Sequence, residues 1–255
     1  MALALLNTVY DSLNIKVPII RELPITNSDM AAVNERATEP SSFDGDNFRG
    51  LKGPLKKYDL SGSTLYVKGN AEAETIRDMA AVLSTAEHPY TVFWFAHPGR
   101  RLFPGDGRPV EAKHINGGYC MSCQPDTIVI YRTEDALRVL IHEMQHASCL
   151  DDHKRAIPLI EAECEAWAEI FYSMFMGKKH GLGPEKAWRI QLAWSLAQNK
   201  RLKERHNVLS PVAYAWRYTV GKEQVWRKYG LLWDIGLKPA TSSLSLGVPE
   251  SHFRN

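Results

Sequence analysis

The chain has 255 residues, of which 44% are hydrophobic and 24% charged, as in soluble globular proteins long enough to bury a core. Its formal net charge of +2 argues against nucleic acid or an anionic membrane as the main partner. No apolar run reaches the length of a membrane helix, and residues 1–6 lack the basic start of a signal sequence. We therefore expect an intracellular, cytoplasmic protein.

Turn-forming residues and weak periodicity mark residues 1–57. This segment could be an extended arm, a pro-segment or a partly disordered leader, and the sequence leaves its role open. Clearer periodicity predicts a folded domain over residues 58–238. The Ser-, Gly- and Pro-containing residues 239–255 predict a loosely ordered tail.

Regular elements are predicted from about residue 59 onward. Strands are indicated by alternating β-branched and aromatic residues, and helices by apolar residues spaced three and four apart. Strands are expected at residues 63–68, 90–96 and 126–131, and helices at 72–85, 134–149, 158–177 and 184–201, with another opening near 210. Thr133 is the expected N-cap of the helix at 134–149. The order predicts an α+β fold, in which a small mixed sheet packs on that helix and a mostly helical C-terminal half follows.

The four cysteines are Cys120, Cys123, Cys149 and Cys164. The first two form a lone C-x-x-C, which by pattern is half of a zinc knuckle or a redox pair. No second pair follows, and this one precedes a strand instead of opening a helix, which favours buried or idle thiols. Four thiols in a chain of this length do not predict a disulfide scaffold.

The helix at 134–149 contains an H-E-x-x-H motif formed by His142, Glu143 and His146. Residues four apart on a helix lie on nearly the same face, so these two imidazoles can bind one metal ion. Leu137, Leu140, Ile141, Met144 and Ala147 form the apolar face of this helix. The motif therefore predicts a metal centre on a helix that directly follows a strand.

The helix at 158–177 is apolar nearly all round, yet it contains Glu161, Glu163, Glu165 and Glu169. Buried carboxylates are costly unless they are paired or bind a metal. Three of them fall on one stripe at four-residue spacing, while Glu163 points away from it. Glu165 is the predicted third metal ligand, and Glu169, one turn later, is placed to accept the second N–H of a metal-bound imidazole.

These residues resemble the gluzincins, zinc peptidases that include thermolysin and the zinc aminopeptidases. In that family, H-E-x-x-H is followed by a Glu on the next helix and an acidic residue four positions later. The aminopeptidase branch has the same 18-residue gap as lies here between His146 and Glu165. Its ligand helix reads like Asn-Glu-Gly-Phe-Ala-Glu, against Cys-Glu-Ala-Trp-Ala-Glu at 164–169. The resemblance covers about residues 126–172, departs at Cys164, and includes no counterpart of the exopeptidase motif.

The resemblance implies a divergent zinc metallopeptidase, a hydrolase that binds one Zn²⁺ per chain and takes a peptide or protein as substrate. His142, His146 and Glu165 would be the ligands, with Glu169 behind them. Glu143 would act as general base on a zinc-bound water and pass the proton to the leaving amine. Tyr214, preferred over Tyr218, His180 and His206, would stabilise the oxyanion, although core packing also explains a Tyr there. The strand near residues 119–131 could offer an edge to an extended peptide.

Other interpretations remain open. A metzincin-like scheme would use Asp152 as third ligand, but its loop needs a left-handed Gly where this chain has Cys149. Alternatively, the histidines are ordinary and Glu165 pairs with Arg138 or Lys178. A non-catalytic, zinc-stabilised protein of peptidase fold, serving as a structural or virion component, is the alternative function. Substrate, cleavage specificity and oligomeric state are not predicted.

Overall fold

The computed structural model describes residues 2–16, 18–38, 51–236 and 242–254. The chain divides into two compact units. The sheet unit comprises Asn14–Gly99 and Asn116–Leu150, and the helical unit comprises Met1–Leu13, Arg100–Ile115 and Asp151–Asn255. The fold is α+β, with a six-stranded mixed sheet and a mostly helical C-terminal half, as predicted.

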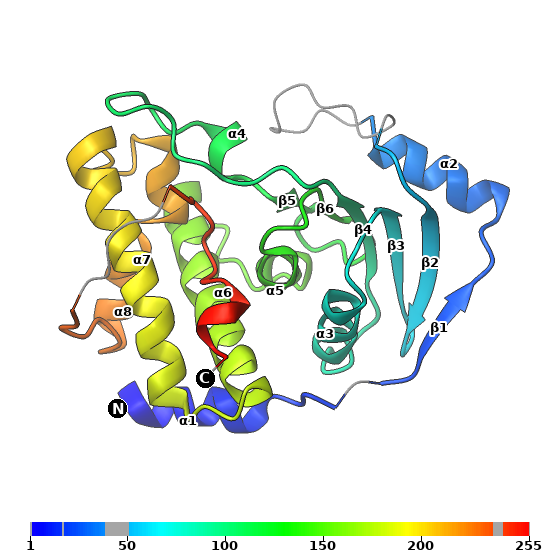
Figure 1. The fold of residues 1–255 in the computed structure, drawn as a ribbon, viewed down its shortest axis with the longest axis horizontal. Helices are drawn as coiled ribbons and strands as arrows, with labels where there is room; N and C mark the ends of the chain where they lie inside the picture. Colours follow the sequence, from blue (N-terminus) through cyan, green and yellow to red (C-terminus); the bar gives the residue numbers. More distant parts are fainter. Residues whose placement is uncertain (1, 17, 39–50, 237–241, 255) are drawn as a thin grey trace. The chain divides into compact units, whose positions relative to one another are not determined.

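The sheet has the strand order β1-β2-β3-β4-β6-β5 (Figure 1). Its central pairs, β3 with β4 and β4 with β6, are parallel, and the outer pairs are antiparallel. The strands are β1 (Ile20–Leu23), β2 (Leu55–Leu60), β3 (Ser63–Gly69), β4 (Thr91–Ala96), β5 (Gly118–Tyr119) and β6 (Ile128–Ile130). The predicted strands at 63–68, 90–96 and 126–131 correspond to β3, β4 and β6. Sequence reasoning missed β1 and β2, and β5 lies outside the three predicted strands.

Alternate residues of the central strands face opposite sides of the sheet. Tyr66, Phe93 and Val129 lie in one register row and pack with Val33 of α2 (Asn27–Arg36). The other face carries the buried Val92, Trp94, Ile128 and Ile130, and α3 (Ala73–Leu83) and α5 (Ala136–Ala147) pack against each other beside the sheet (Figure 1). The central strands are therefore covered on both faces, which is why they read as nearly continuous apolar runs.

Helix α5 begins two residues later than predicted. Asp135 precedes it with left-handed backbone (φ 60°), and its side chain makes no capping hydrogen bond. Thr133 is not the N-cap, because its backbone N–H and hydroxyl both donate to the carbonyl of His97 instead, at 2.9 and 3.3 Å. The loop before α5 is thus hydrogen-bonded to His97, the residue that follows β4.

The helical unit is built around two helices of 23 residues each, α6 (Ile157–Lys179) and α7 (Pro184–His206), which lie side by side in Figure 1. Gly177 does not end α6 as predicted. A Cβ there would lie 2.5 Å from Ala187 Cβ, so glycine allows the close approach of α7. The remaining elements are α1 (Ala2–Ser12), α4 (Ala112–Ile115), 3₁₀ helix η2 (Tyr214–Tyr218), α8 (Lys222–Lys228) and 3₁₀ helix η3 (Glu250–His252).

Both chain ends contain regular structure within the described residues. The segment predicted as an arm, 1–57, supplies α1 to the helical unit and β1 and α2 to the sheet unit, while residues 39–50 lie outside the described ranges. The predicted tail, 239–255, is not loose from residue 242 onward. Leu244, Leu246 and Phe253 are at most 1% exposed, and Val248 accepts a hydrogen bond from Tyr172 at 3.0 Å.

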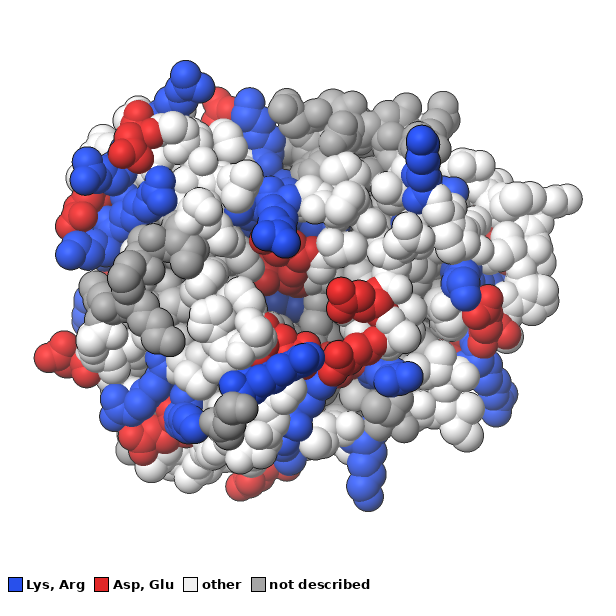
Figure 2. All heavy atoms as spheres, in the orientation of Figure 1, with Lys and Arg blue, Asp and Glu red and all other residues white. Residues whose placement is uncertain are grey.

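The exposed surface carries charges of both signs. On the face shown in Figure 2, Lys and Arg side chains are interspersed with Asp and Glu. Among the described residues, every helix is too short or too polar to cross a membrane.

Candidate metal centre

His142 and His146 lie on one face of α5, as the motif predicts. Their Nε2 atoms are 3.1 Å apart and their rings meet edge to face. Two imidazole nitrogens bound tetrahedrally to zinc at 2.0–2.1 Å would be about 3.3 Å apart. A single N–H···N hydrogen bond would also give the observed distance. The pair therefore fits a shared zinc ion without rearrangement of α5.

Glu143, between the two histidines in sequence, is 5% exposed. Gly118 of the edge strand β5 lies against it, since a Cβ on Gly118 would stand 3.3 Å from Glu143 Oε1 and 2.6 Å from Val139 Cγ1. The absence of a side chain at 118 leaves room for the carboxylate between helix and strand. Cys120 donates a thiol hydrogen bond to the backbone carbonyl of Glu143 at 3.4 Å, which ties the same segment to α5.

The C-terminal end of α5 is a left-handed turn. Cys149 has φ 60°, its N–H donates to the carbonyl of His146 at 3.1 Å, and the N–H of Leu150 donates to the carbonyl of Gln145 at 3.2 Å. This pair of bonds is a Schellman motif, in which glycine usually occupies the left-handed position. A non-glycine residue costs about 1–2 kcal/mol there. The left-handed turn that the metzincin-like scheme needs is thus formed by cysteine, so the residue type at 149 does not exclude that scheme.

Asp152, the third ligand of that scheme, is exposed and accepts the N–H of Lys154 at 3.2 Å. Among the described residues, the candidate metal-binding groups include its neighbours Asp151 and His153 but not Asp152 itself. Asp152 is therefore the weaker candidate.

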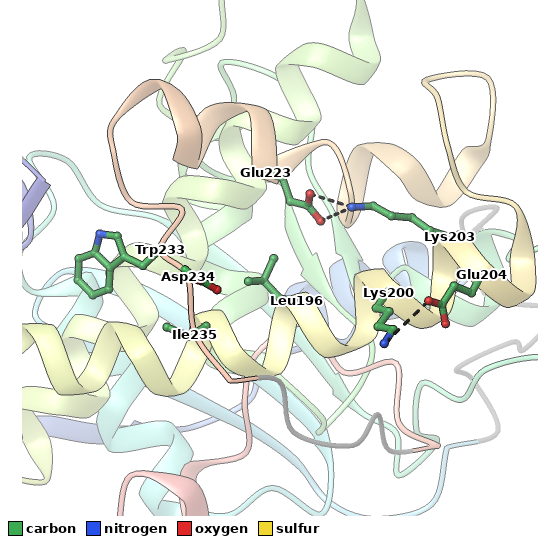
Figure 3. A pocket seen from close by; sticks show the side chains of 8 residues that line it. All are labelled: Leu196, Lys200, Lys203, Glu204, Glu223, Trp233, Asp234 and Ile235. Carbon is green, nitrogen blue, oxygen red and sulfur yellow. Dashed lines mark hydrogen bonds and ion pairs between the residues drawn. The ribbon is translucent and has the colours of Figure 1, made fainter.

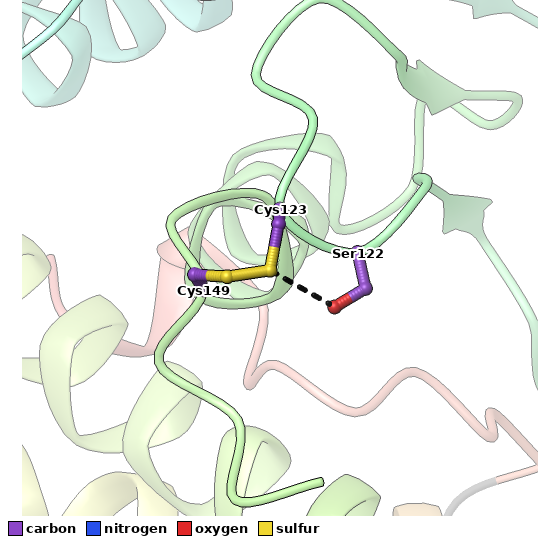
Figure 4. Close-up of a disulfide and its surroundings, with 3 residues drawn as sticks. All are labelled: Ser122, Cys123 and Cys149. Atoms are coloured by element: carbon purple, nitrogen blue, oxygen red, sulfur yellow. Dashed lines mark hydrogen bonds between the residues drawn. A yellow bond between two sulfur atoms is a disulfide. The ribbon is translucent and has the colours of Figure 1, made fainter.

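The expectation of idle thiols is wrong for two of the four cysteines. Cys123 and Cys149 form a disulfide, with Cα atoms 4.4 Å apart (Figure 4). Cys120 and Cys164 are not disulfide-bonded, and the Cys164 thiol donates to Asp151 Oδ1 at 3.3 Å. The two cysteines of the C-x-x-C pattern therefore do not bond to each other, because Cys123 is bonded to a cysteine 26 residues later. With Cys123 in a disulfide, the pattern does not form half of a zinc knuckle.

The four carboxylates of α6 lie in different surroundings. Glu165 and Glu169 are at most 2% exposed, Glu161 is half-buried, and Glu163 forms an ion pair with Arg155. Glu163 was predicted to point away from the other three carboxylates, and its ion pair with Arg155 agrees with that prediction. Together with His142 and His146, Glu161 makes up a His–His–Glu group that could hold a metal ion. Sequence reasoning preferred Glu165, one turn later on the same stripe.

Glu169 is held by a buried polar network within the helical unit. Its Oε1 pairs with Lys222, which is 1% exposed, and its Oε2 accepts the hydroxyl of Ser195 at 2.8 Å. Ser195 accepts in turn from Gln191 at 2.9 Å. Lys222 is the cation that the sequence did not reveal, since it stands 53 residues after Glu169 with no local signal connecting them.

Tyr214 and Tyr218 lie on η2, with hydroxyl oxygens 3.4 Å apart. Burial raises the pKa of Tyr218, and the negative charge of Glu161 raises it further. The hydroxyl of Tyr218 therefore stays protonated and able to donate. This electrostatic link places Glu161 and the two tyrosines in one neighbourhood of the helical unit.

The chain matches no protein-family model, no curated protein and no solved structure. Its function therefore has to be inferred from its own side chains.

The two cations considered as partners of Glu165 differ in their surroundings. Lys178 Nζ donates to the carbonyls of Tyr10 and Leu13, at 2.8 and 2.7 Å, so it binds the C-terminal end of α1. Arg138 is 1% exposed on α5. Lys178 is thus occupied by main-chain oxygens and is a poor partner for Glu165.

A surface pocket of about 390 Å³ in the helical unit is unrelated to the predicted site (Figure 3). Both of its lysines pair with glutamates, with Lys203 2.7 Å from Glu223 and Lys200 4.0 Å from Glu204. Leu196, Trp233, Asp234 and Ile235 complete its lining. None of the predicted site residues lines this pocket.

Proposed function

We propose that the chain is a zinc-dependent peptidase of gluzincin type, with His142 and His146 as metal ligands and Glu143 as general base. The observation that carries the proposal is the pair of Nε2 atoms 3.1 Å apart with a buried carboxylate next to them in the same helix. A purely structural metal site has no need of that carboxylate.

The third ligand is a carboxylate of α6, either Glu161 or Glu165. Zinc in hydrolases takes three protein ligands and leaves one position open. Glu165 has the spacing of the aminopeptidase branch. The carboxylate of Glu161 has an oxygen within 4.8 Å of a ring nitrogen of each histidine. Both candidates belong to the same row of carboxylates on α6. Glu169, one turn beyond Glu165, is held in place by Lys222 and Ser195.

When bound, zinc would lower the pKa of water and polarise a scissile carbonyl. The chain's own groups supply the proton transfer: Glu143 accepts a proton from water and returns it to the leaving amine. Its burial beside Gly118 restricts the carboxylate to a narrow range of positions, which favours a base of fixed geometry. Tyr214, or its neighbour Tyr218, would donate a hydrogen bond to the developing oxyanion.

The substrate class is an extended peptide. Strand β5 is at one edge of the sheet and β6 occupies only one of its sides, so an extended segment can pair with the other side. Gly118, the residue in contact with Glu143, belongs to this strand. A peptide that adds to β5 would therefore pass close to the general base.

Removal of the metal is expected to abolish cleavage of an extended peptide library. Treating the full chain with 1,10-phenanthroline should reduce cleavage to background, and stoichiometric Zn²⁺ added after dialysis should restore it. The non-chelating 1,7-phenanthroline is the matched control. Cleavage that persists without metal would contradict the proposal, and a metal-loaded chain that cleaves no peptide would favour a zinc-stabilised structural protein.

A further inference from the structure

We propose that the Cys123–Cys149 disulfide is a redox-controlled clamp on the end of α5 that carries His146. The inference concerns regulation of the metal centre, and it rests on the proposed function only for its effect on metal affinity. Every group in it belongs to the sheet unit.

The contacts of both cysteines converge on one carbonyl. His146 O accepts the N–H of Cys149 at 3.1 Å and the N–H of Cys123 at 2.9 Å. The disulfide itself joins the segment that precedes β6 to the residue two positions after α5 ends (Figure 4). The cross-link and two backbone hydrogen bonds therefore fix the residue expected to bind the metal.

Both half-cystines have backbone conformations that need outside support. Cys123 has φ 61° and Cys149 has φ 60°, in the left-handed region that residues with a Cβ rarely occupy. Such conformations persist only where the surrounding structure holds them. Once the sulfur–sulfur bond is broken, each residue can relax to negative φ, and this relaxation would break the two hydrogen bonds to His146 O.

The disulfide is open to a reductant. Both cysteines of the disulfide are exposed, whereas Cys164, which keeps a thiol, is buried. A dithiol reductant attacks one sulfur as thiolate, so that a mixed disulfide forms and the other cysteine leaves as thiolate and takes a proton. The second thiol of the reductant then displaces the remaining cysteine. The reductant ends as a disulfide and the chain gains two thiols, in a balanced two-electron exchange.

The expected consequence is weaker metal binding by the reduced chain. Groups that orient a metal ligand change affinity by about 10–100-fold when they are lost. We expect reduction to raise the zinc dissociation constant at least about 10-fold and to speed amide hydrogen exchange at residues 146–150, with both changes reversed by reoxidation.

The test compares oxidised and reduced forms of the full chain after dithiothreitol treatment and anaerobic desalting. Thiol counting should give two free thiols before reduction and four after. Zinc affinity is measured by competition with a chromogenic chelator, and amide exchange by mass spectrometry. Cys149→Ser should behave as the reduced wild type in both redox states. Cys164→Ser, which removes a buried thiol outside the disulfide, should keep the full redox response.

Four free thiols in the untreated chain, or unchanged exchange at residues 146–150 on reduction, would overturn the clamp. An altered exchange rate with unchanged zinc affinity would overturn the link to the metal. If neither form binds zinc, the proposed function fails, while the exchange data still decide whether the clamp exists.

Discussion

Replacing Glu143 by Gln is expected to reduce peptide cleavage by about 10²- to 10⁴-fold while zinc content stays unchanged. Gln fills the space beside Gly118 with a side chain of nearly the same shape, but its amide cannot accept and return a proton at neutral pH. The measurement is kcat/KM on a cleaved library peptide, together with zinc analysis of the same sample.

The matched control is Glu163→Gln on α6. Glu163 points away from the stripe and pairs with Arg155, so its loss should leave kcat/KM within about twofold. Equal activity of Glu143→Gln and the wild type would remove Glu143 from the mechanism. Loss of zinc together with activity would mean that Glu143 supports the metal site instead.

Replacing Lys222 by Met is expected to lower the free energy of unfolding by about 3–5 kcal/mol. Lys222 and Glu169 are at most 1% exposed and form a buried ion pair, so the variant would leave a buried carboxylate with its cation removed. Urea denaturation followed by tryptophan fluorescence measures the loss, because Trp226 lies beside Lys222, with Nζ 5.6 Å from the ring centroid.

Lys203→Met is the control for this prediction. Lys203 also pairs with a glutamate, Glu223, but its side chain is 35% exposed, so its removal should cost less than about 1 kcal/mol. The double variant Lys222→Met/Glu169→Leu should recover part of the loss, since an apolar pair of similar volume can replace a buried ion pair. Equal stability of Lys222→Met and Lys203→Met would show that the buried pair is not a determinant of stability.

The elements best predicted from the sequence are those whose packing repeats along the chain. Strands β3 and β4 are buried on both faces, so their nearly continuous apolar runs indicate buried strands. Helix α7 starts at Pro184, a position where proline is favoured, so its start is also visible in the sequence. Strand β5 has two residues in a Gly-rich stretch, and β1 has four with only half-buried ends, so neither has a pattern long enough to detect.

Helix ends were harder to predict, because distant residues decide them. Thr133 has the chemistry of an N-cap, yet it bonds to His97. Gly177 has the chemistry of a helix terminator, yet α6 passes through it where α7 approaches closely. Cys149 occupies a left-handed position where glycine is usual, and its disulfide partner Cys123 lies 26 residues away in the sequence. In each case the deciding contact is tertiary, so the local sequence signal indicates something else.

The metal motif was predictable because His142, Glu143 and His146 lie within a single helical turn, where sequence spacing fixes geometry. The carboxylates of α6 show the limit of this reasoning. A four-residue period predicts which stripe faces a site, but it cannot choose between Glu161 and Glu165, which share that stripe one turn apart. Lys222, which pairs with Glu169, belongs to α8, so no local sequence pattern could predict this ion pair.

Zinc stoichiometry of purified variants tests the central claim most directly. The wild type and Glu143→Gln should each bind one zinc ion per chain, and His146→Ala should bind none. Of Glu161→Ala and Glu165→Ala, the variant that loses zinc identifies the third ligand, with Glu163→Ala retaining it as control. A His146→Ala chain that still binds one zinc ion, or a wild type that binds none, would contradict a metal centre on α5.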